Sequence, residues 1–287
     1  MTTNKITMKT VQQFMTDYQP IYSPLYGIFL DRAVAYSADV GRMDFRRVEA
    51  IGDIRQHRIL PKDTEIKQIN VTDTSKSYRK YFFANQYVVS DLQDQEGAAD
   101  VVAQVLDEHQ LQADEILMTG DGTSPADVLN NGLYFSADPN YTLEASKSIP
   151  AGETRLSSFH AAVVASATKA NQIAGRKAIL FYGEGILPLV NAIYPASSRA
   201  WKTVLQEVLG PDYAIIEVPS ALTPSGANGW IVANYDQVKL HYTLLPELAA
   251  QGYNEEKMYY WFNFKMGSMM LEVLAKNGII RQPVTLA

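Results

Sequence analysis

The sequence contains no cysteine, no long apolar run and no excess of positive charge, and each absence excludes a class of protein. Without cysteine the chain forms neither disulfides nor thiolate metal sites, so nothing indicates an oxidising compartment and we expect a cytoplasmic origin. The 25 Lys and Arg residues are outnumbered by 31 Asp and Glu residues. The net charge of −6 argues against tight binding to a nucleic-acid backbone, although it is compatible with loose contact with packed nucleic acid.

The sequence also lacks a segment that would cross a membrane or direct secretion. The first ten residues, MTTNKITMKT, have no apolar region of the kind found in signal peptides. The most apolar stretch, residues 178–196, is interrupted by glycine, glutamate, proline and asparagine. Internal repeats and low-complexity tracts are absent, so 287 residues with 47% hydrophobic content predict an ordinary globular protein with one large or two smaller cores.

No set of residues converges on catalytic or metal-binding chemistry. The four histidines are scattered, and none has a partner at metal-ligand spacing. They are His57, His109, His160 and His241. No G-x-S-x-G elbow is present to support nucleophilic catalysis. Gly183 to Gly185 follow an apolar run, but Pro188 replaces the third glycine of a dinucleotide loop and no Walker lysine follows, so we predict a strand-to-helix turn.

The segment DEILMTGDGTS, residues 114–124, combines acids with two glycines around an aspartate. Its TGDG sequence also occurs in the magnesium-holding hinge of P-type ion pumps, but the DKTGT loop and membrane domain of those pumps are missing. We predict a turn at a helix end, in which Gly120 and Gly122 adopt positive φ and Asp121 accepts bonds from nearby amides. The neighbouring acids are predicted to serve an interface.

The first part of the chain predicts an arm followed by a long hairpin. Residues 1 to about 40 carry prolines and scattered aromatics with no regular period, which is typical of an arm. In residues 41–80 only 12 of 40 positions are apolar, too few to offset the entropy lost on ordering. Strand-like stretches at residues 43–51 and 65–71 predict a two-stranded loop, which needs a surface to lie on because isolated hairpins are marginally stable.

A helix and an α/β lobe are predicted next. The capping box from Ser90 to Gln93 and the amphipathic pattern beyond it predict a helix to about Gln110. After Pro150, helix and strand patterns alternate. They predict helices at about 155–174 and 198–209, and strands at 177–182, at 213–218 and around Trp230 and Val238.

The run MYYWFNFKM, residues 258–266, predicts a long aromatic strand before the return segment AKNGIIRQP. Its two faces alternate, and one carries Phe262, Phe264 and Met266. Such a strand could stack nucleobases, but we predict a sheet core that packs against the amphipathic helix.

Charge is divided between the predicted hairpin and the predicted helix. Residues 41–80 have a net charge of +4, whereas residues 91–121 carry nine acids and no Lys or Arg. Acids on a helix are often only its solvated face. Here, however, Glu96 and Asp100 repel each other at i and i+4, which costs about 0.2 to 0.5 kcal/mol. Asp107 and Glu108 lie near the negative end of the helix dipole.

A basic partner would reverse both penalties, so we predict that the hairpin docks on the acidic helix of a neighbouring copy. Contacts of this heterologous kind build rings or shells. The predicted contact residues are basic on the hairpin and acidic on the helix. They are Arg46, Arg47, Arg55, Arg58 and Lys62 on the hairpin, and Glu96, Asp100, Asp107 and Glu108 on the helix.

The order of these parts resembles the major capsid proteins of tailed bacteriophages, which have the Hong Kong 97-like fold. The resemblance covers nearly the whole chain, including DEILMTGDG and the following LNNGLYF at residues 129–135. It implies an α+β fold with an N-terminal arm, an extended E-loop, a peripheral domain with a long spine helix and β-sheet, and an axial α/β domain. The implied ranges are 1–40 for the arm, 41–88 for the E-loop, 89–152 and 236–272 for the peripheral domain, and 153–235 with 273–287 for the axial domain.

The resemblance further implies a structural protein with no catalytic residue, cofactor or metal. Such a protein assembles into hexamers and pentamers of an icosahedral shell around double-stranded DNA. Its implied partners are other copies of itself, a separate scaffolding protein, a portal, possible decoration proteins and loosely held DNA, with no membrane. It would reside in the virion after assembly in the host cytoplasm. Two alternatives stay open: an encapsulin-like nanocompartment with the same fold, and a soluble α/β enzyme that uses the lobe.

Overall fold

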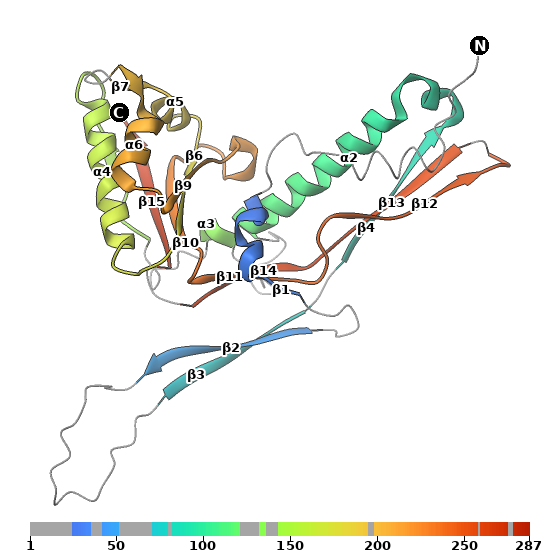
Figure 1. Ribbon diagram of the computed structural model, residues 1–287, viewed down its shortest axis with the longest axis horizontal. Helices are drawn as coiled ribbons and strands as arrows, with labels where there is room; N and C mark the ends of the chain where they lie inside the picture. The colour runs from blue at the N-terminus through green and yellow to red at the C-terminus, as the bar shows by residue number, and fades with distance from the viewer. Residues whose placement is uncertain are drawn as a thin grey trace, which may run out of the picture.

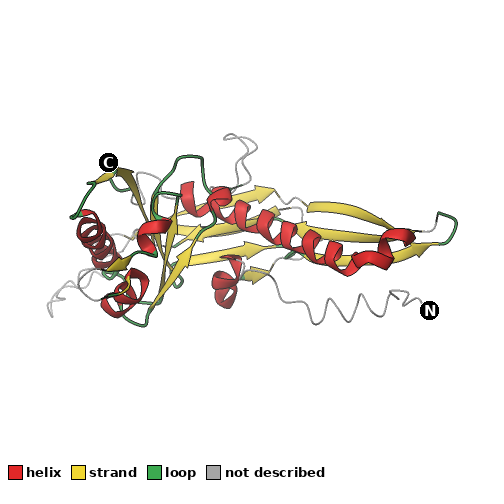
Figure 2. Ribbon diagram, turned by 90° about the horizontal axis from the view of Figure 1, so that it is seen from above, coloured by secondary structure: helices red, strands yellow, loops and turns green. Residues whose placement is uncertain are grey.

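The computed structural model describes residues 25–35, 42–51, 71–79, 82–120, 132–135, 143–194, 198–257, 259–274 and 278–287. They form an elongated molecule, in which a compact α/β lobe lies at one end and a long helix lies along a sheet toward the other (Figures 1 and 2). The mixture of helices with separate, largely antiparallel sheets confirms the predicted α+β class.

The long helix α2 (Asp91–Thr119) begins directly after Ser90, as the capping box predicts. The helix end predicted from periodicity, at about Gln110, is wrong. Apolar residues continue beyond that position, and Ile116, Leu117 and Met118 are all buried. The helix ends at Gly120, whose N–H donates to the Ile116 carbonyl at 2.9 Å and whose φ is +87°. This conformation favours glycine, which confirms the predicted turn at Gly120; Asp121 and Gly122 lie outside the described residues.

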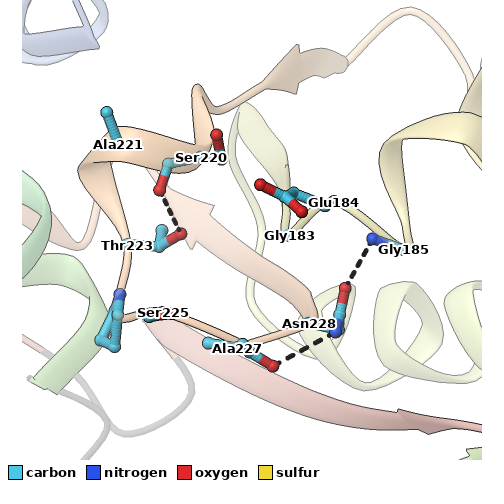
Figure 3. Close-up of a pocket in the computed structure, with 11 residues that line it drawn as sticks. Gly183, Glu184, Gly185, Ser220, Ala221, Thr223, Ser225, Ala227 and Asn228 are labelled. Atoms are coloured by element: carbon cyan, nitrogen blue, oxygen red, sulfur yellow. Dashed lines mark hydrogen bonds between the residues drawn. The ribbon is translucent and has the colours of Figure 1, made fainter.

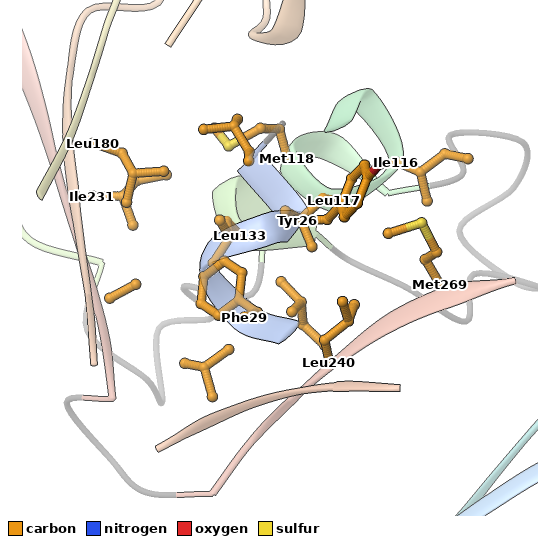
Figure 4. Close-up of a cluster of buried hydrophobic side chains, with 14 of the residues drawn as sticks. Tyr26, Phe29, Ile116, Leu117, Met118, Leu133, Leu180, Ile231, Leu240 and Met269 are labelled. Atoms are coloured by element: carbon orange, nitrogen blue, oxygen red, sulfur yellow. The ribbon is translucent and has the colours of Figure 1, made fainter. Parts of the chain in front are cut away.

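Two short elements near the start of the chain pack against the body rather than forming a featureless arm. They are the 3₁₀ helix η1 (Leu25–Arg32) and strand β1 (Val34–Ala35), which pairs parallel with β11 (Val238–Tyr242). Tyr26 and Phe29 of η1 enter a buried apolar cluster with residues of α2 and of strand β14 (Met269–Val273) (Figure 4). β11 lies between β1 and β14 in a three-stranded sheet.

The predicted hairpin consists of β2 (Arg42–Ile51) and β3 (Val71–Arg79), which pair antiparallel from Arg42↔Arg79 to Ile51↔Val71. β2 agrees with its prediction. The partner strand begins where the prediction for residues 65–71 ended, and residues 65–70 lie outside the described residues. The sequence VTDTSKSYR mixes Val, Thr and Tyr, which favour strands, with Asp and Lys, which do not, and its few apolar residues give no clear alternation. In Figure 1 the hairpin projects from the rest of the molecule.

A second three-stranded sheet lies under α2, with β13 (Tyr259–Gly267) between β12 (Glu247–Asn254) and β4 (Phe82–Ser90). Phe262, Phe264 and Met266 are buried while Lys265 is exposed, and α2 contacts both β13 and β4. These contacts confirm the predicted packing of the aromatic strand. Residues 82–88, which the predicted domain division placed in the E-loop, lie in this sheet.

The lobe contains a five-stranded sheet in the order β5-β15-β10-β6-β9. The strands are β5 (Lys147–Ile149), β15 (Ile279–Leu286), β10 (Gly229–Asn234), β6 (Lys177–Tyr182) and β9 (Tyr213–Glu217). The lobe helices are α4 (Arg155–Ala170), α5 (Leu187–Val190) and α6 (Trp201–Leu209), with η2 (Ser220–Leu222) after β9. A small hairpin of β7 (Ile193–Tyr194) and β8 (Arg199–Ala200) precedes α6.

Each face of this sheet is covered by its own core. Ile179 and Phe181 of β6 face a cluster with residues of α4 and α6, whereas Leu180 and Tyr182 face a cluster with α2, η1 and α3 (Gly132–Phe135). This double coverage explains why all six residues of β6 are buried and why the strand reads as an uninterrupted apolar run. Among the helices of the described ranges, none is long and apolar enough to span a bilayer.

Candidate intersubunit surfaces

The structure places the predicted charged contact residues on two separate elements. Arg46 and Arg47 lie in β2, whereas Glu96 and Asp100 lie in the first half of α2. Further along α2, Asp107 is half-buried and Glu108 is exposed. Arg55, Arg58 and Lys62 lie outside the described residues.

Within one molecule, β2 and β3 stand apart from α2 (Figure 1). Of the basic set, the two described residues Arg46 and Arg47 are therefore not brought to α2 in the single chain, and the pairing of the two sets between copies stays a prediction.

Asp114 corrects the prediction that the acids near the TGDG turn all serve an interface. Its side chain is fully buried, with Oδ2 accepting the Leu25 N–H at 2.8 Å and Oδ1 accepting the Tyr26 N–H at 3.1 Å. Burial raises the pKa of Asp114 to about 6, although the two backbone N–H donors act in the opposite direction. The carboxylate thus satisfies the first amides of η1, which have no partner inside that helix. Asp114 fastens the start of the described chain to α2.

The histidines behave as structural residues where they are described. His109 is buried and its Nδ1–H donates to the Val105 carbonyl at 2.9 Å, while its ring lies beside Phe264 with centroids 5.2 Å apart. His241 is buried with Glu272, their Nε2 and Oε2 atoms 2.9 Å apart. His160 is half-buried, and His57 lies outside the described residues. Within the described ranges, no three potential ligands gather closely enough to hold a metal ion.

Sequence reasoning missed exposed apolar side chains on β7 and α6, two neighbouring elements of the lobe. Ile193 of β7 is 68% exposed and Val208 of α6 is 51% exposed, although both are large hydrophobic residues. Val204 lies one helical turn before Val208 and is half-buried, so this side of α6 is apolar toward solvent. We name Ile193, Val204 and Val208 the tip surface. The helical spacing of Val204 and Val208 was visible in the sequence, but their exposure depends on which side of α6 the core covers.

No protein-family model matches the chain, and no curated protein sequence matches it. Solved structures do match along nearly the full length. The capsid of Myoviridae phage XM1 is 12% identical, with 93% of this chain and 94% of that chain covered at a TM-score of 0.58. A structure of Mycobacterium phage Bobi is 10% identical, with 98% and 99% covered at a TM-score of 0.58. A virus-like particle from Pyrococcus furiosus is 10% identical, with 95% of each chain covered at a TM-score of 0.55. The chain therefore has the Hong Kong 97-like capsid fold that the order of its parts implied.

Proposed function

We propose that this chain is the major capsid protein of a tailed bacteriophage, assembling as hexamers and pentamers of an icosahedral shell around double-stranded DNA. The observation that carries the proposal is the projecting β2–β3 hairpin on a fold shared with phage capsids (Figure 1). The proposed role is structural and requires no catalytic residue or cofactor.

Contacts within a single molecule do not account for the stability of the hairpin. β2 has ten residues, which span about 33 Å, and its pairing partner is β3 alone among the described strands. Two strands with no third strand or covering helix are marginally stable in water, and both of their outer edges are free to pair or pack. A surface on the next copy would stabilise the hairpin, and the repeat of that contact from copy to copy would generate a closed ring.

The proposed electrostatic contact joins the E-loop of one copy to the spine helix of the next. We place the E-loop between β1 and β4, with Arg46, Arg47, Arg55, Arg58 and Lys62 opposite Glu96, Asp100, Asp107 and Glu108 of the neighbour. An exposed pair contributes about 0.2 to 1 kcal/mol, so the effect depends on many pairs repeated around the shell and on apolar contacts beside them.

The tip surface is proposed as one such apolar contact. A scaffolding protein, a portal and decoration proteins are proposed as further partners, with the net charge of −6 allowing loose contact with packaged DNA. The proposed location is the virion, after assembly in the host cytoplasm.

Electron microscopy of the purified protein tests the proposed function. We expect closed shells whose yield falls as salt rises from about 0.1 M to about 1 M, because the Debye length shortens from about 10 Å to about 3 Å. Equal yields at both salt concentrations would contradict the electrostatic contact. A monomer at every protein concentration would contradict shell formation itself and would favour an enzyme.

Glu108→Lys isolates the acidic side of this contact. Glu108 is exposed on α2, so the substitution should leave the isolated subunit folded while it places a positive charge opposite the basic hairpin. We expect the protein concentration needed for assembly, measured by light scattering, to rise several-fold. Glu153→Lys is the matched control, because Glu153 is exposed beside α4 in the lobe. Equal effects of the two variants would show that net charge, rather than this contact, controls assembly.

Ile193→Asp tests the tip surface. Because Ile193 is already 68% exposed, the stability of the subunit should change by less than about 0.5 kcal/mol, whereas ring assembly should weaken. Thr203→Asp is the matched control, since Thr203 is exposed on another side of α6. Unchanged assembly of the Ile193 variant in light scattering would remove the tip surface from the shell contacts.

A second candidate, an encapsulin-like nanocompartment, is favoured by the likeness to the Pyrococcus furiosus particle. It shares the fold but encloses protein cargo. Shell diameter and the nucleic-acid content of particles purified from the native source separate the two candidates. Particles filled with double-stranded DNA support the phage capsid, and particles filled with protein support the nanocompartment.

A further inference from the structure

The lobe contains a polar pocket at the carboxyl ends of β6 and β9. Its volume is about 530 Å³, within the range of sites that bind small molecules or side chains. Two loops form it, the Gly183–Gly185 turn after β6 and the segment 220–228 that includes η2 (Figure 3). In sheets of this kind, the carboxyl ends of parallel strands are a frequent position for ligands.

Hydrogen bonds of Asn228 join the two loops to each other and to β15, and so fix the shape of the pocket. The side chain of Asn228 accepts the Gly185 N–H at 2.9 Å and donates to the Gly226 carbonyl at 3.3 Å (Figure 3). The Asn228 carbonyl accepts the Val284 N–H of β15 at 2.8 Å. Gly183 has φ of +94°, and a Cβ there would lie 2.2 Å from the Ala227 carbonyl oxygen. The close approach of the loops therefore requires glycine at this position.

The walls of the pocket select for a cation that donates hydrogen bonds. Glu184 is the one charged side chain among the lining residues that the structure describes, and its carboxylate points from the turn toward Ser220 and Thr223 (Figure 3). Ser220, Thr223 and Ser225 add hydroxyl oxygens, and the apolar lining is limited to alanine and proline. An anion would be repelled by Glu184, and a large apolar ligand would find few apolar walls. A guanidinium group matches a carboxylate surrounded by further acceptors.

Four of the five arginines in the body of the molecule have a side-chain partner within the chain, Arg155 being the exception among the described residues. In the body, Arg32 pairs with Asp236 at 2.9 Å, Arg176 pairs with Asp31 at 3.2 Å, and Arg199 pairs with Glu207. Arg281 donates to the Tyr134 carbonyl at 2.6 Å. Of the 11 arginines in the chain, four lie in the strands of the hairpin. They are Arg42, Arg46, Arg47 and Arg79.

We propose that the lobe pocket binds an arginine of the β2–β3 hairpin of a second copy, with Glu184 as the pairing carboxylate. In Figure 1 β2 and β3 lie well apart from the lobe, so the arginine must come from another molecule. The inference rests on the proposed shell, because only an assembly holds two copies in one fixed arrangement. It adds a defined receptor site in the lobe to the acidic surface of α2.

Binding of a small probe tests the chemistry of the pocket. Nα-acetylarginine amide is titrated into the full chain at low protein concentration and followed by NMR. We expect binding that weakens about tenfold or more in Glu184→Gln, because the charge-assisted hydrogen bonds are lost. Glu153→Gln, on the same lobe, should bind the probe like the unmodified chain, and Nα-acetyllysine amide should bind more weakly than the arginine probe. Equal binding to both variants, or no binding, would overturn the assignment of the pocket.

Cross-linking in assembled particles tests the source of the arginine. Ala221 lines the pocket and is exposed, so Ala221→p-benzoylphenylalanine places a photoreactive group there while Glu184 is retained. After irradiation, we expect mass spectrometry to find links to residues 42–51 or 71–79 of another copy. Shells in which the links fall elsewhere would overturn this inference and leave the proposed function intact. A chain that forms no shell would overturn both.

Discussion

Replacing Asp114 with alanine is expected to lower the free energy of unfolding of the unassembled subunit by about 2 to 4 kcal/mol near pH 7. The substitution removes the acceptor of the Leu25 and Tyr26 N–H groups, which the buried start of η1 cannot satisfy internally. Each buried donor without a partner costs about 1 to 3 kcal/mol, and the sum is reduced because the variant no longer buries a carboxylate. Urea unfolding measures the change. Glu115→Ala, an exposed neighbour on α2, should change stability by less than about 0.5 kcal/mol.

The same residue predicts how stability depends on pH. The pKa of Asp114 is raised to about 6 in the folded chain, so the folded state binds a proton that the unfolded state releases near pH 4. Proton binding to Asp114 therefore stabilises the folded chain at low pH, and this stabilisation is lost as pH rises through about 6. The free energy of unfolding should fall by about 1 kcal/mol between pH 5 and pH 7.5 from this cause. Asp114→Asn keeps one acceptor oxygen and cannot titrate, so the stability difference between wild type and this variant should grow on acidification. A difference that is constant with pH would show that Asp114 does not carry this proton.

Replacing Phe159 with alanine is expected to cost about 3 to 5 kcal/mol, the largest loss that we expect from a single substitution in the lobe. Phe159 projects from α4 into the core, fully buried, and stacks on Trp201 of α6 with ring centroids 4.5 Å apart. It also meets Trp230 of β10 edge-on at 5.6 Å. One ring therefore joins two helices to the sheet, and its removal leaves a cavity that the rigid neighbours cannot close.

Ile193→Ala is the matched control for Phe159→Ala. It also removes a large apolar side chain from the lobe, but Ile193 is 68% exposed, so little buried surface is lost. Tryptophan fluorescence during urea unfolding should show an earlier transition for the Phe159 variant and an almost unchanged one for the Ile193 variant. Similar shifts for both would mean that the lobe core is not organised around the Phe159 ring.

The elements predicted most accurately are those whose sequence signal lies within the element itself. β6 agrees with the prediction at both ends, because six consecutive buried residues produce an apolar run that turn residues interrupt. The start of α2 agrees because a capping box is read within four residues. β13 agrees to within one residue because it is an unbroken run rich in aromatic side chains, which favour strands.

Elements that depend on distant partners were harder to predict. η1 begins where Asp114, 89 residues later in the chain, supplies an acceptor for its first amide. The bounds of β3 follow from its pairing with β2, because its own sequence gives no clear alternation of apolar and polar residues. Asp114 itself was counted with the acids of the interface, since nothing in the neighbouring sequence shows that it points into the core.

The sequence predicted the charges of the candidate contacts but not all of the candidate contact surfaces. The opposite charges of the hairpin and the helix are evident from composition, and the structure places Glu108 at the surface as that prediction requires. The tip surface and the Glu184 pocket were not predicted. Both depend on tertiary arrangement: Ile193 and Val208 come from different elements, and the pocket needs two loops linked by Asn228. Exposure and concavity are properties of the folded chain that hydrophobic periodicity does not encode.

The position of β15 in the lobe sheet bears on when a newly made chain completes its lobe. β15 lies between β5 and β10, so residues 279–286 complete a sheet whose other strands are translated earlier. While these residues are still inside the ribosome, β10 has an open edge and Val284 is absent from the lobe core. A nascent or truncated polypeptide therefore lacks the finished lobe. The fold itself therefore delays completion of the lobe until synthesis has passed residue 286.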